Sequence, residues 1–344
     1  MDTKIVRIND KTEYGEALDQ AKNIILSGGL VVFPTETVYG LGGNGLLSDA
    51  AKKIYSAKGR PSDNPLIIHI AEPCDAEKYA HVSETYYRLA KAFMPGPLTV
   101  IMPKKECIPS SVTGGLDTVA IRCPSHPVAH ALIEKCGVPI AAPSANISGR
   151  PSPTSAKYVV EDMKNRVDMI IDSGECEIGL ESTIVKIDGE KLTLLRPGGI
   201  TYDALCCVCD NVSIAPAVLD KLPENEKPLS PGMKYRHYAP SVDFVLLDGN
   251  DDDVLSFMIS EQKNNGCAVL CYDEEKEMLD ASLSIAIGKK EDLNTQAKKL
   301  FTSLREADKL GAKTIYAHLP QLEGLGLALY NRMIRAAAHT IKKV

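Results

Sequence analysis

The sequence contains no tryptophan and only five phenylalanines among its 344 residues. Few aromatic rings are therefore available to stack on bases, and a net charge of −6 gives no general attraction for a polyanion. These shortages argue against a protein that binds nucleic acid over a broad surface. A basic pocket remains compatible with them, because net charge says nothing about a single cleft.

Other features are missing as well. No apolar run approaches the roughly 20 residues that cross a bilayer, and the segment 1–4 does not open a signal peptide, so we expect a cytoplasmic protein. The ten cysteines form no pair of C-x-x-C knuckles, so we expect reduced thiols rather than zinc, including at Cys206, Cys207 and Cys209. What is present, 44% hydrophobic and 24% charged residues, is ordinary for a soluble globular protein.

The chain divides by composition into three parts. Apolar runs alternate with helical patterns up to about residue 212, which predicts a catalytic α/β domain over 1–212. Prolines then accumulate in 213–240, which favours an extended connector. Its segment 231–238 mixes aromatic and cationic side chains, so we interpret it as an active-site lid rather than a plain tether. Alternation resumes in 241–344, which predicts a small three-layer α/β domain with a mainly parallel sheet.

Hydrophobic periodicity predicts the individual elements. The expected strands are 30–33, 66–70, 98–102, 118–122, 140–142, 169–171, 182–187, 192–196, 244–247, 268–270, 285–287 and 314–316. The expected helices are 13–26, 49–57, 84–93, 127–135, 155–163, 253–260, 294–308 and 327–342.

Several polar clusters lie at the ends of these strands. Lys58 and Arg60 flank a glycine before a proline-fixed turn, which gives a compact corner for an anion. Arg122 and Arg196 end apolar strands, and Ser144 follows another. Each could alone be a structural residue, but four cations at one edge of a sheet would repel one another without a polyanion to bind. We therefore predict a nucleoside triphosphate site, with Mg²⁺ held mainly by phosphates and water.

Four spaced motifs resemble those of the YrdC-like threonylcarbamoyl-AMP synthases: residues 34–41, 58–61, 143–149 and 195–198. Residues 230–240 and the tail resemble the long, two-domain form. The resemblance implies a twisted α/β domain with a deep, positively charged cavity and a small Rossmann-like C-terminal domain. It implies that L-threonine, bicarbonate and ATP react to threonylcarbamoyl-AMP and pyrophosphate, the first step of a tRNA modification completed by a downstream transferase complex.

The resemblance also implies roles for individual residues. Lys58 and Arg60 are the catalytic candidates, and alanine at either position is expected to reduce activity with little loss of stability. The nucleotide set comprises Lys58, Arg60, Asn64, Ser144, Asn146, Ser152, Arg196, Tyr235 and His237. The threonine set comprises Thr35, His69, Arg122 and Ser182. No residue is expected to bind a metal directly.

Two other functions remain open at this point. The same basic cavity could make the protein an RNA-binding module, with a weak contact to tRNA or double-stranded RNA. A carbamoyl-transfer enzyme of hydrogenase maturation shares this type of domain, but such proteins carry zinc-knuckle cysteine pairs, which this sequence lacks.

Overall fold

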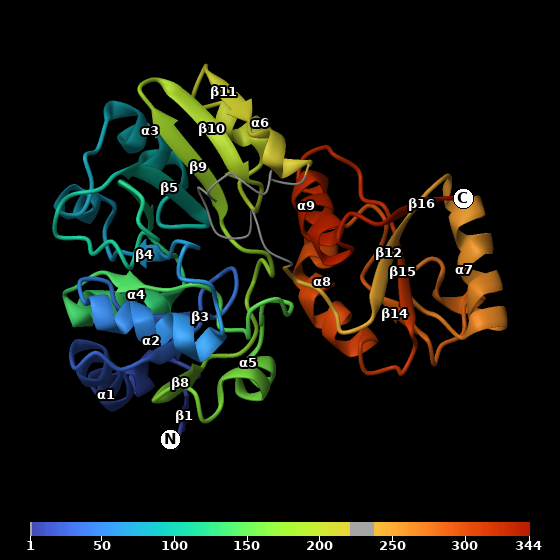
Figure 1. Cartoon of the computed structure of the whole chain (residues 1–344), viewed down its shortest axis with the longest axis horizontal. Coiled ribbons are helices and arrows are strands. Elements are labelled where there is room, and N and C mark those ends of the chain that lie inside the picture. Colours follow the sequence, from blue (N-terminus) through green and yellow to red (C-terminus); the bar gives the residue numbers. More distant parts are fainter. Residues whose placement is uncertain (1, 221–236) are drawn as a thin grey trace. The chain divides into compact units, whose positions relative to one another are not determined.

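A computed structural model describes residues 2–220 and 237–344 (Figure 1). The chain forms two compact units. Unit 1 comprises residues 1–148, 152–177 and 181–234, and unit 2 comprises 149–151, 178–180 and 235–344. Within the described residues, no helix combines the length and the apolar composition that crossing a bilayer requires.

Unit 1 is built on a mixed sheet of 11 strands in the order β1-β8-β2-β3-β7-β4-β6-β5-β9-β10-β11. The strands are β1 (Lys4–Arg7), β2 (Val31–Phe33), β3 (Gly40–Asn44), β4 (Ile67–His69), β5 (Leu98–Pro103), β6 (Thr118–Arg122), β7 (Ile140–Ala141), β8 (Met169–Asp172), β9 (Thr183–Asp188), β10 (Lys191–Arg196) and β11 (Val212–Ile214). Neighbours in sequence are often not neighbours in the sheet, so residues far apart in the chain meet at its centre.

Helices of unit 1 bury regularly spaced apolar side chains against this sheet. In α1, Leu18, Ala21 and Ile25 recur at helical spacing and enter one hydrophobic core with β2, β8 and α4. The helices are α1 (Tyr14–Leu26), α2 (Ser48–Lys58), α3 (Glu84–Phe93), α4 (Pro127–Cys136), α5 (Ala156–Met163) and α6 (Tyr202–Cys206), with short 3-10 turns η1 (Lys11–Glu13), η2 (Pro73–Lys78) and η3 (Pro216–Val218).

Strand β3 was not expected from the sequence, because its segment GLGGN lacks the branched residues typical of strands. The structure shows why glycine is used here. A Cβ atom on Gly42 would lie 2.7 Å from the Phe33 ring and 2.8 Å from the Ile140 side chain. The neighbouring strands β2 and β7 therefore fill the space above β3 with their own side chains.

Unit 2 has a five-stranded, wholly parallel sheet in the order β14-β13-β15-β12-β16. Helix α7 covers one face, and α8 and α9 cover the other (Figure 1). The elements are β12 (Asp243–Asp248), α7 (Asp251–Asn265), β13 (Ala268–Cys271), η4 (Lys276–Met278), β14 (Ser284–Ala286), α8 (Leu293–Ala307), β15 (Thr314–His318), α9 (Gly326–Ala336) and β16 (Ile341–Lys343). The expected three layers and parallel sheet are present in this unit.

The expected helix 327–342 is too long. Helix α9 ends at Ala336, because Ala338 and His339 adopt positive φ angles of 49° and 65°. The chain then turns into β16, which pairs with β12. The strands β1, β11 and β16 were likewise not expected, and none of them has a buried side chain to produce an apolar run.

Candidate active site

Lys58 is the last residue of α2, and Gly59 ends that helix with a φ of 62° that favours glycine. The Lys58 side chain is only 1% exposed. Its Nζ donates to the carbonyl oxygens of Ser144 (2.5 Å) and Asn146 (2.6 Å), and lies 3.2 Å from Asn146 Oδ1. We expected that alanine at Lys58 would cost little stability. That expectation does not fit the structure, because the buried Lys58 side chain holds a loop that is distant in the sequence.

Arg60 and Asn64 form the next part of the same corner. Arg60 is 8% exposed, and its guanidinium donates from Nε to the Asn64 carbonyl (3.3 Å) and from Nη2 to the Pro65 carbonyl (3.1 Å). Asn64 is buried too, and its Oδ1 has no hydrogen-bond partner among the residues described. A buried acceptor without a donor is costly, so it is a natural place for a donor on a ligand.

The strand register separates the predicted residues onto two edges of the sheet. Strand β4 runs antiparallel to β7, with His69 opposite Ile140, so Ser144 and His69 lie at opposite ends of this pair. Arg122 shares the edge of His69, because β6 is parallel to β4. Strand β5 is antiparallel to β6, β9 is parallel to β5, and β10 is antiparallel to β9. Arg196 at the end of β10 therefore also lies on the Arg122 edge.

The expectation of one common edge is therefore wrong, yet the two edges are close. Strand β4 has three residues and β7 has two, so the two edges are roughly 10 Å apart along the strand direction at this point. The turn after β2 belongs to the Ser144 edge, and its Thr35 Oγ1 lies 3.4 Å from Nη2 of Arg122. A side chain from one edge can thus contact a side chain from the other, because the strands between the edges are short.

Arg122 forms a buried ion pair with Glu36. The distance from Arg122 Nη2 to Glu36 Oε1 is 2.8 Å, and the two side chains are 5% and 4% exposed. Glu36 lies in the turn between β2 and β3, where Thr35 Oγ1 accepts from the amides of Thr37 and Val38. These local hydrogen bonds fix the backbone on both sides of the carboxylate.

His69 ends β4 beside Arg122, and the two residues are paired in register. Burial, reinforced by the positive charge of Arg122, lowers the pKa of His69 to about 3. Its Nδ1 lies 3.3 Å from the carbonyl oxygen of Ile140, so the neutral ring donates through that nitrogen. His69 therefore supplies a neutral polar edge to the site at physiological pH.

This neutral histidine predicts an acid sensitivity of the fold. The unfolded chain binds a proton at His69 near pH 6.5 and the folded chain only near pH 3, so stability falls as pH drops through that window. Between pH 7 and pH 5 the loss from this group should be about 2 kcal/mol. Urea unfolding of the wild type and of His69→Gln at both pH values checks this; equal losses in the two proteins would contradict it.

Ser182 and Arg196 connect the two predicted sets on the Arg122 edge. Arg196 donates from Nε to the Ser182 carbonyl (3.0 Å) and from Nη2 to Ser182 Oγ (3.2 Å). Ser182 Oγ also lies 2.7 Å from Oγ1 of Thr99, which is paired in register with Arg122. A residue of the predicted nucleotide set and one of the threonine set are therefore in direct contact.

The remaining predicted residues are less closely connected. Ser152 is buried and donates to Glu181 Oε1, in a contact near the start of β9. His237 belongs to unit 2, where it neighbours Tyr238, whose ring stacks on Phe301. Tyr235 lies outside the described residues, as does most of the segment interpreted as a lid.

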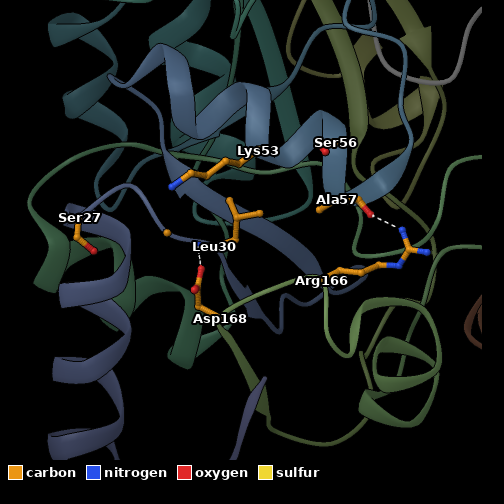
Figure 2. Close-up of a pocket in the computed structure, with 8 residues that line it drawn as sticks. Ser27, Leu30, Lys53, Ser56, Ala57, Arg166 and Asp168 are labelled. Carbon is orange, nitrogen blue, oxygen red and sulfur yellow. Dashed lines mark hydrogen bonds between the residues drawn. The ribbon is translucent and has the colours of Figure 1, made fainter. Parts of the chain in front are cut away.

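A surface pocket of about 550 Å³ lies elsewhere in unit 1, between the ends of α1 and α2 (Figure 2). None of the predicted site residues lines it. Arg166 donates to the Ala57 carbonyl (3.3 Å), and Asp168 accepts from the Leu30 amide (2.8 Å). These contacts satisfy backbone groups at the start of β2 and the end of α2, so we assign the pocket a structural origin.

Two residues of the site were missed from the sequence. Glu36 stands inside the motif 34–41, but a carboxylate gives no sequence signal for an anion-binding site. Thr99 lies within an apolar strand, and only the pairing of β5 with β6 and β9 brings it between Arg122 and Ser182.

Nearly the whole chain resembles known protein families. Residues 23–198 match the family described as Telomere recombination (Sua5, YciO and YrdC proteins), and residues 200–338 match the threonylcarbamoyl-AMP synthase C-terminal domain. The chain is 44% identical over 346 residues to the threonylcarbamoyl-AMP synthase of Pyrococcus abyssi, covering 99% of this chain and 100% of that protein. This chain belongs to the threonylcarbamoyl-AMP synthase family. It is of the long, two-domain form.

Further members support the assignment. The threonylcarbamoyl-AMP synthase of Bacillus subtilis is 43% identical over 322 residues, which are 92% of each chain. The crystal structure of P. abyssi Sua5 complexed with L-threonine superposes with a TM-score of 0.91 at 44% identity, covering 99% of this chain and 100% of that one. The family resemblance read from the four motifs is thus confirmed.

Proposed function

We propose that this chain joins L-threonine, bicarbonate and ATP into threonylcarbamoyl-AMP, releases pyrophosphate, and does so with the buried polar residues of unit 1. It is a nucleotidyltransferase that acts in tRNA modification. The observation that carries the assignment is the full-length match to threonylcarbamoyl-AMP synthases. The RNA-binding alternative is not favoured, because these relatives are synthases over the whole length of the chain.

The nucleotide phosphates are assigned to the Ser144 edge. Lys58 contacts the Ser144–Asn146 loop there, and Arg60, two residues further along the chain, contacts the carbonyl of Asn64. Ser144 Oγ donates to Asn146 Oδ1 (2.5 Å), which keeps both side chains in one orientation. Arg196 reaches this set only across the short strands, because it lies on the Arg122 edge; with it and Ser152, these groups support a positively charged cavity for a triphosphate.

We assign the amino acid to the Arg122 edge; that a member of the family binds L-threonine is supported by the P. abyssi Sua5 structure complexed with it. Arg122 provides a cation for the carboxylate of the substrate. Thr35, Ser182 and neutral His69 provide hydrogen-bonding groups for its hydroxyl and amine. Because the two edges are roughly 10 Å apart, an amino acid and an α-phosphate can be held next to each other.

The reaction then needs positioning and charge stabilisation rather than a protein nucleophile. The threonine amine and bicarbonate form N-carboxythreonine and water, and a carboxylate oxygen of this carbamate attacks the α-phosphorus of ATP. The bond to the β-phosphate breaks, and pyrophosphate leaves with the electron pair. Lys58, Arg60 and Arg196 neutralise the charge that develops on the phosphate oxygens.

Magnesium fits this site as an ion that the nucleotide brings with it. Mg²⁺ prefers to keep several waters and to bind phosphate oxygens rather than a protein cage. When bound, it would neutralise charge on the triphosphate. The hydroxyls and amides around Lys58, including the unpartnered Asn64 Oδ1, can contact its water shell.

Unit 2 and the connector complete the proposal. We retain the boundaries 1–212, 213–240 and 241–344, with the connector as a lid that brings Tyr235 and His237 to the nucleotide. The parallel sheet of unit 2 supports a Rossmann-like domain. The product is consumed by a transferase complex on tRNA, which suits a cytoplasmic location.

The proposal is tested by pyrophosphate release with threonine, bicarbonate and ATP omitted in turn. We expect release only with all three present, together with an adenylate that hydrolyses to AMP. Release that persists without threonine would make the protein a plain ATP pyrophosphohydrolase. Salt-dependent tRNA binding without any ATP turnover would instead favour the RNA-binding module.

A further inference from the structure

Glu36 is a buried charged residue of unit 1 whose chemistry the proposed reaction leaves unexplained. It is an acidic group among the cations of a site for two anionic substrates, ATP and bicarbonate. Its side chain is 4% exposed, and its contact with Arg122 is the single ion pair it makes in the described chain. A buried ion pair contributes little to stability compared with apolar residues of the same volume. The pair therefore calls for an explanation other than stability.

The surroundings of the pair show which of its atoms can act. Both carboxylate oxygens of Glu36 and the Nε of Arg122 are sealed from solvent without a further hydrogen bond. Arg122 Nη2 is occupied by Glu36 at 2.8 Å and by Thr35 Oγ1 at 3.4 Å. Nη1 differs, because it is not among the sealed atoms and makes no bond within the described residues. One nitrogen of the guanidinium is thus left for a ligand.

The elements on either side hold this arrangement rigidly. Arg122 ends β6 between β4 and β5, where His69 and Thr99 are its partners in register. Glu36 lies in the turn that the Thr35 hydroxyl fixes through the amides of Thr37 and Val38. A guanidinium on a flexible stem would otherwise sample several rotamers and lose entropy on binding.

We propose that Glu36 is a positioning residue for threonine binding, whose carboxylate holds the Arg122 guanidinium so that Nη1 meets the carboxylate of the amino acid. This inference rests on the proposed assignment of threonine to the Arg122 edge. Glu36 does not touch the substrate, because its oxygens are sealed. Its charge acts through Arg122, and it affects threonine binding rather than the chemistry at phosphorus.

The test compares Glu36→Gln with Glu36→Asp in steady-state pyrophosphate release. Gln has the size of Glu without its charge, whereas Asp keeps the charge on a shorter stem. We expect Glu36→Gln to raise KM for threonine roughly tenfold or more, with kcat and KM for ATP within about threefold of wild type. Glu36→Asp should lie between Gln and wild type. A residue that only fills space predicts the reverse order, with Gln harmless and Asp harmful.

The matched control is Glu275→Gln, which removes a buried carboxylate paired with His318 (2.7 Å) in unit 2. This variant should lose stability while its KM for threonine stays unchanged. All assays are run well below the melting midpoint of each variant. Either an unchanged or a lower KM in Glu36→Gln would overturn the inference: an unchanged KM would show that the carboxylate does not position Arg122, and a lower KM would show that it competes with threonine for Arg122.

Arg122→Gln, measured in parallel, separates this inference from the proposed function. If Arg122→Gln abolishes threonine saturation while Glu36→Gln keeps the wild-type KM, the threonine site stands and the role of Glu36 is refuted. If Arg122→Gln also keeps the wild-type KM, the threonine assignment fails and the role of Glu36 fails with it.

Discussion

Lys58→Ala is expected to lower kcat for threonylcarbamoyl-AMP formation by at least about 100-fold, the usual effect of removing one group that stabilises developing charge. The same change should destabilise unit 1 by about 2–4 kcal/mol, because the carbonyls of Ser144 and Asn146 lose a buried donor. Pyrophosphate release and thermal unfolding measure the two effects separately. This expected loss differs from the prediction made from the sequence, which was that Lys58→Ala would cost little stability.

Two further variants make this prediction specific. Lys58→Met keeps the apolar stem and should recover part of the stability but none of the activity. Lys52→Ala removes an exposed lysine of the same helix, which pairs with Asp49 at 2.9 Å, and should leave both quantities near wild type. Substantial activity in Lys58→Met would refute the assignment of Lys58 to the phosphates.

Arg122→Gln is expected to raise KM for threonine by about 100-fold, because a charge-assisted bond to the substrate carboxylate is lost. It should also lower the free energy of unfolding by about 3–5 kcal/mol, since the buried Glu36 loses its counter-charge. Calorimetric titration with threonine and urea unfolding give the two numbers.

The double variant Arg122→Gln, Glu36→Gln distinguishes binding from folding. With both charges removed, no unpaired carboxylate remains buried at position 36, so most of the stability should return. Threonine binding should remain lost. Recovery of binding together with stability would mean that Arg122 supports the fold alone and that threonine binds elsewhere.

Much of the site could be predicted because its motifs are local. The helix ending at Gly59, the cations on either side of it and the hydroxyls after β7 are all visible in short segments. The burial of Lys58 was not visible, because its acceptors are 86 and 88 residues away in the chain. Burial of a long cation depends on such distant partners.

The fold, too, could be predicted only in part from the sequence. Strands with several buried side chains, such as β2 and β5, gave clear apolar runs, whereas β1 at the sheet edge and glycine-rich β3 did not. Strand direction and register cannot be read from apolar runs, because one run fits either orientation. This is why Arg196 was expected beside Ser144 and lies on the other edge.

The shortness of β4 and β7 has a consequence for how this domain can evolve. If phosphates bind at one end of these strands and the amino acid at the other, the strand length acts as a ruler between the reacting groups. Two extra residues in each strand would keep every side chain on its face of the sheet but add about 7 Å to the gap. Attack needs reacting atoms within about 3.5 Å. Such an insertion would therefore leave a folded protein that binds both substrates but cannot join them.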